Sequence, residues 1–478
     1  MFTLKVKGTI LFLILLICVQ VPSLAASNMK PSTNTQVLAL SAINKTEAIQ
    51  TMKDNTIGLA DKNSVSAMSM TVVRDDQIVS ELYHGQDVMG HNVTANSSYW
   101  INSATKPFTA TAALIADEQG RLNLDADISQ YLPFVYSDPY YPNAKTTMRE
   151  LLAFRSGMTA FFDRPSYQDT YYSVFYGWNQ SSYVDSSCST LQYLNVTYPN
   201  SVIQFFSPTG KYYSQQIWSP DRKPGKDDTQ IDWSEFSYTL AGYIIEQVAN
   251  QTMQQFMDEQ VFNKIGATHT KYLLSDLAVN DTMWGQPPKC NDFITYFQDR
   301  GAYGLWSSSN DIAKFLLIHM NQGIYEGQYI LNSTDVALMQ TMSYTAHSNN
   351  PIYKTDWGLG WLLPHTVYQD GWVGYSSPFY GYDTEMWMKT IGNHTYGYVV
   401  LSAGGAAFLT EPVRTAIEAG YFNPDNATSI STDTNTDGGH PTSNRTPIFS
   451  YFEIYLLLTA CAIKLVRKYK INKKVEMN

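Results

Sequence analysis

The pattern of apolar and polar residues along the chain predicts strands near both ends and helices between them. Two apolar runs between residues 66 and 85 flank Asp75-Asp76 and predict a β-hairpin. Two alternating runs within residues 383–405 predict another hairpin. Helical spacing of apolar residues occurs in three intervening segments, at 105–120, 234–262 and 308–323. This order predicts one antiparallel sheet packed by helices, with a helical insertion in the middle of the chain.

Boundary residues support two of these helices. Pro107 lies in the first turn of the segment at 105–120, and Gly120 follows its last turn. The third segment begins with Ser-Ser-Asn-Asp at residues 308–311, whose side chains are typical helix N-caps. Both segments are therefore expected to be helices with defined ends.

Both ends of the chain resemble targeting segments. Lys5 and Lys7 precede an apolar run that ends in small residues, so residues 1–25 are predicted to be a secretory signal peptide. Apolar residues dominate the segment at 448–463, and basic residues follow it. We expect a transmembrane helix at 448–466 and a basic cytoplasmic tail at 467–478. A span usually needs about 20 apolar residues, so a peripheral amphipathic helix is the alternative.

The region between these ends is expected to form one folded body at residues 40–425. A stretch rich in Ser, Thr, Asn and Gly at 427–447 then links the body to the membrane as a stalk. Cys188 and Cys290 are the two cysteines of the body, and whether they pair is open. The body is larger than a typical domain, which fits a sheet domain with a helical insertion.

Further features agree with passage through the secretory pathway. Eleven Asn-x-Ser/Thr sequences predict N-linked glycans on the surface, at Asn44, Asn92, Asn96, Asn179, Asn195, Asn250, Asn280, Asn332, Asn393, Asn426 and Asn444. We therefore expect a single-pass protein of the cell surface or an endomembrane, with its body lumenal or extracellular. It would be secreted if the C-terminal helix does not span the membrane.

Composition excludes several other classes of protein. With 44% hydrophobic and 14% aromatic residues, the 478-residue chain is globular rather than disordered or fibrous. Its net charge of -10 argues against nucleic acid as a partner, since phosphate binding needs a basic surface. The eight histidines have no metal-ligand spacing, so neither a metal nor another cofactor is implied.

Ser103 and Lys106 are the first candidates for chemistry. They lie three residues apart at the start of the predicted helix at 105–120, so their side chains share one face. A helix N-terminus favours an oxyanion, and a desolvated lysine amine can accept the serine proton. The same spacing recurs at Ser27 and Lys30, and an ordinary helix-capping serine is the alternative.

A longer set of motifs gives this pair a context. Five blocks, in this order, resemble the serine β-lactamase and penicillin-binding-protein superfamily in its class C-like branch with D-aminopeptidases and esterases. They lie at residues 103–133, 146–158, 236–252, 300–323 and 356–363. The resemblance covers roughly residues 65–420. It implies an α/β (α+β) fold of the β-lactamase/transpeptidase type, with an antiparallel sheet flanked by helices and an all-helical subdomain.

The resemblance also implies roles. In that superfamily the first-motif serine is acylated and the lysine acts as base, which here are Ser103 and Lys106. A Tyr-x-Asn motif moves protons, and its position falls on Trp233-Ser234-Glu235. The indole of Trp233 can donate a hydrogen bond but cannot accept a proton, which leaves it a substrate-binding role. Glu235 beside Lys106 would favour the charged ammonium, so Glu235 is either a base or one half of a structural ion pair. Tyr213, in Tyr213-Ser214-Gln215, is the alternative to Trp233.

The third motif is altered as well. Its position falls on Tyr375-Ser376-Ser377, followed by Pro378. The superfamily implies an oxyanion hole of two backbone N–H groups, one on the nucleophile and one just after this motif, and Pro378 has none. A one-residue bulge could place Ser377 there instead. Tyr375, Ser376 and Ser377 are predicted to bind substrate, and Tyr375 could supply an acid or base or simply line the cleft.

Two functions remain open on these residues. The first is a membrane-anchored or secreted serine hydrolase that forms an acyl-enzyme on Ser103 with a small ester, amide or D-amino-acid peptide. The second is a catalytically inactive surface glycoprotein of the same fold that acts as a binding module. A Ser103–Lys106 separation above about 4 Å, with Lys106 paired to Glu235, would favour the second.

Overall fold

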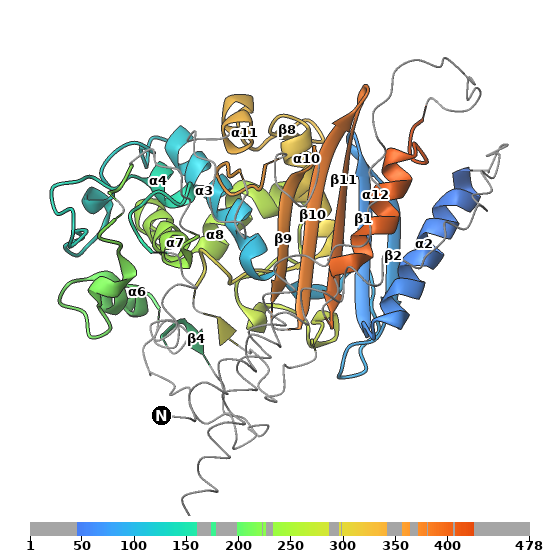
Figure 1. Cartoon of the computed structure of the whole chain (residues 1–478), viewed down its shortest axis with the longest axis horizontal. Helices are drawn as coiled ribbons and strands as arrows, with labels where there is room; N and C mark the ends of the chain where they lie inside the picture. Colours follow the sequence, from blue (N-terminus) through green and yellow to red (C-terminus); the bar gives the residue numbers. More distant parts are fainter. Residues whose placement is uncertain are drawn as a thin grey trace, which may run out of the picture. The chain divides into compact units, whose positions relative to one another are not determined.

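A five-stranded antiparallel sheet is the central element of the computed structural model (Figure 1). The structure describes residues 45–159, 174–177, 198–221, 223–225, 233–285, 296–297, 299–341, 356–363, 371–379, 381–404 and 407–424. The sheet has the order β2-β1-β11-β10-β9. Its strands are β1 (Ala67–Arg74), β2 (Gln77–Gly85), β9 (Val373–Phe379), β10 (Tyr382–Ile391) and β11 (His394–Ala403).

Both predicted hairpins are confirmed. The turn between β1 and β2 contains Asp75 at a positive φ of 54°, a conformation that Asp tolerates in tight turns. Gly392 has φ 61° in the turn between β10 and β11. β1 then pairs with β11, with Ala67 opposite Ala403 and Arg74 opposite Tyr396. The two ends of the folded body therefore meet in the middle of the sheet.

Small two-stranded sheets support the rest of the chain. They pair β3 (Ser98–Trp100) with β6 (Trp306–Ser308), β4 (Tyr176–Gly177) with β5 (Tyr296–Phe297), and β7 (Ile324–Tyr325) with β8 (Gln328–Tyr329). The α-helices are α2 (Lys45–Lys62), α3 (Lys106–Glu118), α4 (Met148–Leu152), α6 (Asn200–Phe206), α7 (Glu235–Ala249), α8 (Met253–Met257), α9 (Asn263–Ile265), α10 (Ser309–Met320), α11 (Ser333–Met339) and α12 (Glu411–Glu418).

Helices cover both faces of the sheet. α10 packs on β1, β10 and β11. α12 lies on the other face, where Glu418 accepts hydrogen bonds from Trp372 Nε1 at 3.1 Å and Lys389 Nζ at 3.3 Å (Figure 1). Side chains alternate between faces along each strand, so odd-numbered residues of β10 such as Lys389 face α12 and even-numbered ones face α10. The expected flanked antiparallel sheet is confirmed.

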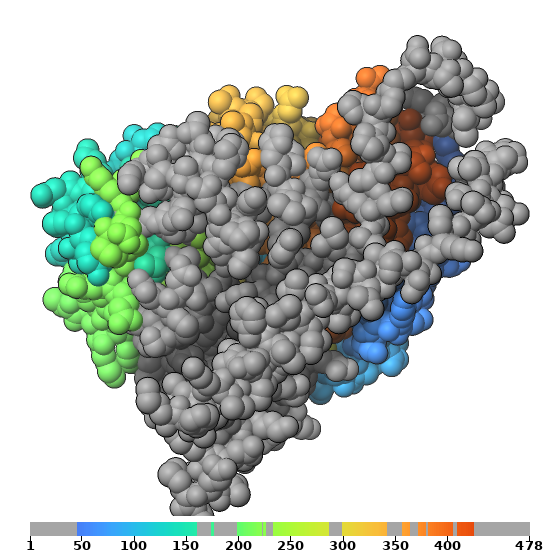
Figure 2. Space-filling model, in the orientation of Figure 1, coloured from blue at the N-terminus to red at the C-terminus, as the bar shows by residue number. Residues whose placement is uncertain are grey.

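A separate group of helices forms the middle of the chain. α7 contacts α3, α4, α6 and α8, and the Tyr238 hydroxyl of α7 donates to the Leu152 carbonyl of α4 at 2.6 Å. In the view of Figure 2 the residues of α4 and α6 lie on the side of the molecule away from α2. This group corresponds to the expected helical insertion.

The segment at 234–262 is more broken than its apolar pattern predicts. α7 ends where Asn250 adopts the left-handed conformation, with φ 53°. Thr252 then starts α8 through a capping box with Gln255, and a π-helical turn follows at Asp258–Phe262. The other two helix predictions are confirmed by α3 and α10, whose N-cap is Ser308.

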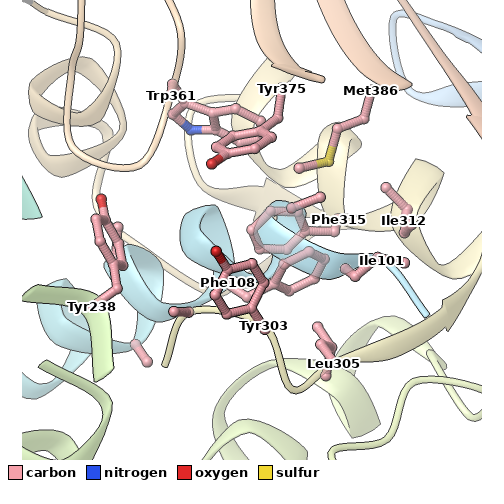
Figure 3. Close-up of a cluster of buried hydrophobic side chains, with 14 of the residues drawn as sticks. Ile101, Phe108, Tyr238, Tyr303, Leu305, Ile312, Phe315, Trp361, Tyr375 and Met386 are labelled. Carbon is pink, nitrogen blue, oxygen red and sulfur yellow. The ribbon is translucent and has the colours of Figure 1, made fainter. Parts of the chain in front are cut away.

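One apolar core joins the sheet to the helices. Tyr375 and Met386 point from β9 and β10 toward Phe315 of α10 and Phe108 of α3 (Figure 3). The rings of Phe108 and Phe315 stack with centroids 3.8 Å apart. Tyr238 and Tyr303 border the same cluster (Figure 3). The core therefore reaches directly beneath the residues predicted to carry chemistry.

Several predictions lie outside the described residues. These are the signal peptide at 1–25, the stalk at 427–447, the C-terminal helix at 448–466, the tail at 467–478, Cys188 and Cys290. Among the helices in the described part of the chain, none has the length and apolar character needed to cross a bilayer. The described residues from Ala48 onward belong to one compact unit.

Gly301 is the point where the turn before β6 passes closest to α7. A Cβ at Gly301 would overlap the backbone carbonyl of Tyr238, and a Cβ at Gly242 would lie 2.7 Å from the Gly301 Cα. We expect Gly301→Ala to lower the free energy of unfolding by at least about 1–3 kcal/mol, because backbone must move to admit the methyl group. Denaturant unfolding of the full chain measures this change in the free energy of unfolding.

The control is Gly58→Ala in α2, where nothing lies within 4 Å of the added Cβ. It should be neutral or stabilising by up to about 1 kcal/mol. Equal effects of the two substitutions would contradict the close approach.

Candidate active site

Ser103 lies at a sharp bend between a strand and a helix. β3 ends at Trp100, Asn102 has a positive φ of 55°, and a 3₁₀ turn at Asn102–Thr105 leads into α3. The Thr105 hydroxyl donates to the Asn102 carbonyl at 2.7 Å and accepts from the Leu305 N–H at 3.2 Å, which ties the bend to the neighbouring loop. Ser103 is therefore held on hydrogen-bonded backbone, and its side chain is 8% exposed.

Lys106 Nζ lies 2.8 Å from Ser103 Oγ. In a 3₁₀ turn, side chains three residues apart lie directly above one another, which explains the contact. The amine is completely buried and also donates to the Ala302 carbonyl at 3.3 Å. The side chains of Ser103 and Lys106 are therefore in direct hydrogen-bond contact.

Glu235 supplies the third partner of the lysine. It is the first residue of α7, and its Oε2 forms an ion pair with Lys106 Nζ. The other carboxylate oxygen, Oε1, accepts a hydrogen bond from Trp233 Nε1 at 2.8 Å. Trp233 and Glu235 thus occupy the position expected for the second motif. Trp233 orients Glu235, and Glu235 contacts the lysine.

Opposing effects act on the ionisation of Lys106. Complete burial lowers the pKa of Lys106, because desolvation penalises the charged amine. The negative charge of Glu235, followed by that of Asp299, works against this and raises the lysine pKa. Lys106 Nζ donates hydrogen bonds to Ser103 Oγ and the Ala302 carbonyl, and the Glu235 carboxylate forms the ion pair. Burial is the larger of the opposing effects, so the pKa of Lys106 lies below its usual range.

A buried aspartate positions the Ala302 carbonyl. Asp299 Oδ1 accepts from the N–H groups of Gly301 and Ala302, both at 2.9 Å, and its Oδ2 accepts from Thr239 Oγ1 at 2.6 Å. The turn around Gly301 is therefore bound to α7. Sequence reasoning did not single out Asp299 or Ala302, although the Asp-x-Gly spacing ahead of a strand is a turn signal.

Aromatic rings surround the charged pair. The ring centroid of Tyr303 lies 4.6 Å from Lys106 Nζ, and that of Trp233 lies 6.0 Å away. Phe154 stacks on Trp233 with centroids 5.4 Å apart, and Trp357 lies 4.8 Å from Phe154. Electron-rich ring faces stabilise a cation while excluding water. This enclosure keeps the electrostatic interactions of Lys106 strong.

Tyr375 projects from β9 into the same enclosure. Its ring lies 5.8 Å from Trp357 and 6.2 Å from Trp233, measured between centroids. Burial raises the pKa of Tyr375 well above its usual range, and the charge of Glu235 adds to this, while the nearby Ser103 hydroxyl opposes it. Its own hydroxyl has no hydrogen-bond partner among the described residues. Tyr375 is thus a neutral phenol with a donor available beside Ser103.

Ser376 and Ser377 separate onto opposite faces of the sheet. Ser377 Oγ accepts a hydrogen bond from the Ser103 backbone N–H at 3.1 Å. Ser376 Oγ instead donates to Glu385 Oε1, on the face covered by α12. Strand alternation requires this, since neighbouring residues point to opposite faces. Ser376 therefore points away from Ser103 and its role in binding substrate stays a prediction, whereas Ser377 contacts the backbone of Ser103.

The register of β9 decides the position of Pro378. β9 pairs with β10 without interruption, with Ser377 opposite Thr384 and Pro378 opposite Asp383. The one-residue bulge considered from sequence is absent from this strand pair. Pro378 consequently keeps the position after the third motif, where it offers no N–H.

Tyr213 does not join this group. Its ring packs on Trp218 with centroids 5.5 Å apart, and its charged neighbour is Asp138. No contact among the described residues links Tyr213 to Lys106. The described contacts therefore place Trp233 and Glu235 beside Lys106, while Tyr213 packs on Trp218, and the role predicted for Tyr213 stays a prediction.

Comparison with known proteins agrees with this geometry. A profile of the Beta-lactamase family matches residues 50–413 of the chain. The chain belongs to the Beta-lactamase family. A β-lactamase of Pseudomonas fluorescens is 24% identical over 288 residues, which are 59% of this chain and 64% of that protein. The family is one of serine hydrolases with the fold described above.

Solved structures show the same fold. A penicillin-binding protein homologue from Pyrococcus abyssi, described as octameric, superposes with a TM-score of 0.62 at 18% identity, covering 78% of this chain and 77% of that one. A D-alanine carboxypeptidase from Burkholderia cenocepacia gives a TM-score of 0.55 at 16% identity, covering 79% and 100%. The predicted superfamily and fold class are confirmed.

No group of three or more His, Cys, Asp or Glu side chains in the described part of the chain is arranged to hold a metal ion. Glu235, the carboxylate nearest Lys106, forms an ion pair with that lysine.

The ion pair of Lys106 with Glu235 can be tested by comparing the free energies of unfolding of single and double variants. Lys106→Met leaves the buried carboxylate without its counter-charge, and we expect a loss of about 3–5 kcal/mol in the free energy of unfolding. The double variant K106M/E235Q removes both charges and should recover most of that loss. Lys62→Met at the exposed end of α2 is the control and should change stability by less than about 0.5 kcal/mol. Additive losses in the double variant, measured by denaturant unfolding, would contradict the pairing.

Proposed function

We propose that this protein is a serine hydrolase that forms an acyl-enzyme on Ser103 with a small ester, amide or D-amino-acid peptide. The observation that carries the proposal is the 2.8 Å contact between Ser103 Oγ and Lys106 Nζ within a buried site. Relatives named as a β-lactamase and as a D-alanine carboxypeptidase support a cyclic or D-configured amide as substrate.

Glu235 completes the proton path in this proposal. Lys106 is the primary base, and in its ammonium form it must first release a proton, because an ammonium has no acceptor site. Glu235 is in direct contact and receives that proton. The neutral amine then takes the proton of Ser103 as Oγ attacks the substrate carbonyl carbon, and returns it to the leaving group. Water, deprotonated by the same route, hydrolyses the acyl-enzyme.

Trp233 and Tyr375 act around this path. The Trp233 N–H bond to Oε1 leaves Oε2 of Glu235 directed at the lysine. Tyr375 is held neutral and has its hydroxyl unpaired among the described residues, so it can donate a hydrogen bond to the bound substrate. In this proposal Trp233 positions Glu235 and Tyr375 faces the substrate. Neither residue takes the place of Lys106 or Glu235 as proton acceptor.

A catalytically inactive binding module is the second candidate. Two observations support it. The Ser103 N–H already donates to Ser377 Oγ, so a protein group occupies the usual oxyanion position. Pro378 has no backbone N–H, so that position also lacks its second donor. The ion pair of Lys106 with Glu235 fits this candidate, whereas the short Ser103–Lys106 contact does not.

Covalent labelling distinguishes the two candidates. We expect a fluorophosphonate or a labelled penicillin to add its mass to the peptide containing Ser103 of the full-length protein, because Lys106 activates that hydroxyl. Ser103→Ala is the matched control and should abolish the adduct while leaving the unfolding curve nearly unchanged. Mass spectrometry of the digested protein reads the result. Absence of any Ser103-dependent adduct with both probes would favour the binding module.

We further propose that the protein follows the secretory pathway and is anchored by residues 448–466. Of the predicted glycan sites that the structure describes, Asn92, Asn96, Asn250, Asn280 and Asn393 are exposed, as attachment requires. Alkaline carbonate should leave the full-length protein in the membrane pellet, whereas a chain ending at residue 447 should be released. Extraction of the full-length protein would show that the anchor is wrong, and peptide-N-glycosidase treatment tests the glycans by a shift in mass.

A further inference from the structure

The chain lacks one donor that serine hydrolases of this fold use, and Ser377 lies where a substitute is needed. We propose that the side-chain hydroxyl of Ser377 is the second oxyanion donor, in place of the backbone N–H that Pro378 cannot supply. This inference rests on the proposed acylation of Ser103. It gives Ser377 a chemical role through its side chain, whereas the fold ordinarily uses main-chain donors at this position.

The contact between the nucleophile and Ser377 is the first support. The Ser103 N–H, which points to the oxyanion position, donates to Ser377 Oγ at 3.1 Å. Ser103 and Ser377 are 8% and 5% exposed, so both groups lie in an enclosed part of the site. In the free protein, the Ser377 oxygen therefore occupies the place where a substrate carbonyl oxygen would bind.

The hydrogen-bonding direction of β9 is the second support. Gly374 exchanges two backbone hydrogen bonds with Leu362, donating at 3.0 Å and accepting at 2.9 Å, on the edge away from β10. In an antiparallel strand the backbone groups of alternate residues point to the same side. The nitrogen of Pro378 thus lies on this open edge, and the backbone N–H of Ser377 points to β10. Neither residue can offer a main-chain donor to the substrate.

The Ser377 hydroxyl retains the capacity to donate. A hydroxyl has one donor and two acceptor sites, and this one accepts from Ser103. None of the hydrogen bonds found among the described residues uses the Ser377 O–H as donor. An incoming carbonyl oxygen displaces Ser377 Oγ from the Ser103 N–H, and rotation about χ1 then turns the hydroxyl toward that oxygen.

The step balances with groups of this chain. Lys106 first passes a proton to Glu235. Ser103 Oγ then forms the bond to the carbonyl carbon, the carbonyl π electrons move to the oxygen, and the serine proton passes to the neutral Lys106 amine. The oxyanion accepts one hydrogen bond from the Ser103 N–H and one from the Ser377 O–H. Collapse of the intermediate restores the carbonyl, breaks the bond to the leaving group and transfers the proton to it.

A double-variant rescue tests the assignment. In the full-length protein, we expect Ser377→Ala to slow Ser103 labelling by a fluorophosphonate or penicillin by about 10²–10³-fold, the usual effect of losing one oxyanion donor. Pro378→Ala places an N–H on the open edge of β9. The labelling rate of the double variant S377A/P378A should therefore be at least about tenfold higher than that of S377A. A merely structural role of Ser377 would not respond to a new N–H at the next residue.

Controls separate this inference from the proposed function. Thr390→Ala, at an exposed position of β10, should label at the wild-type rate, and unfolding curves should show that every variant is folded. Tyr375→Phe, assayed in parallel, measures any contribution of the phenol.

Each outcome decides the matter. No label on the wild-type protein overturns the proposed function and this inference together. A labelled wild type with an S377A rate within about threefold overturns the inference alone. A slow S377A that P378A fails to rescue also overturns it, because Ser377 would then act in another way.

Discussion

A lysine ammonium held without access to water is the constraint on which this site depends. Lys106 is fully buried among aromatic rings, where an uncompensated charge would cost several kcal/mol. Three acceptors from three parts of the chain compensate it: Ser103 Oγ, the Glu235 carboxylate and the Ala302 carbonyl. The start of α3, the start of α7 and the turn before β6 must therefore meet at one point. The glycines that let α7 and that turn touch belong to the same requirement.

Replacing a tyrosine–lysine pair by a tryptophan, a glutamate and a lysine changes the protonation problem. Burial lowers the pKa of Lys106 and so disfavours its charged form, whereas the negative charge of Glu235 raises that pKa. The site thus brings two buried groups of opposite charge into contact, with Ser103 hydrogen-bonded to Lys106. Trp233 adds a single fixed donor and no exchangeable acceptor. In the proposed mechanism, reactivity depends on how easily a proton moves from Lys106 Nζ to Glu235 Oε2.

Much of this arrangement could be predicted from the sequence because it is local or follows a recognisable pattern. The hairpins at β1–β2 and β10–β11, the spacing of Ser103 and Lys106, and the place of Trp233 and Glu235 at the start of α7 are of this kind. Strand alternation could also have separated Ser376 from Ser377 once β9 was assigned. The break at Asn250 was readable as well, since Thr252 and Gln255 form a capping box.

The rest depends on contacts between distant segments. Nothing near Tyr213 shows that it packs on Trp218 rather than beside Lys106. Asp299 matters only because its turn meets Thr239 of α7, 60 residues earlier in the chain. Ser377 meets Ser103 across 274 residues, through the pairing of β9 at the edge of the sheet. Such partners are set by the packing of the whole body, which short sequence patterns do not encode.

Pro378 also has a consequence for the sheet as a whole. β9 is an edge strand, and unpaired edges can recruit extended segments of other chains. Here the Leu362 backbone closes the edge at Gly374, and Pro378 removes a donor four residues later. A peptide laid along β9 would therefore find a broken ladder of main-chain partners. Pro378 therefore affects two properties of this strand at once, because it removes a main-chain donor from the proposed oxyanion site and makes the edge less suited to strand addition.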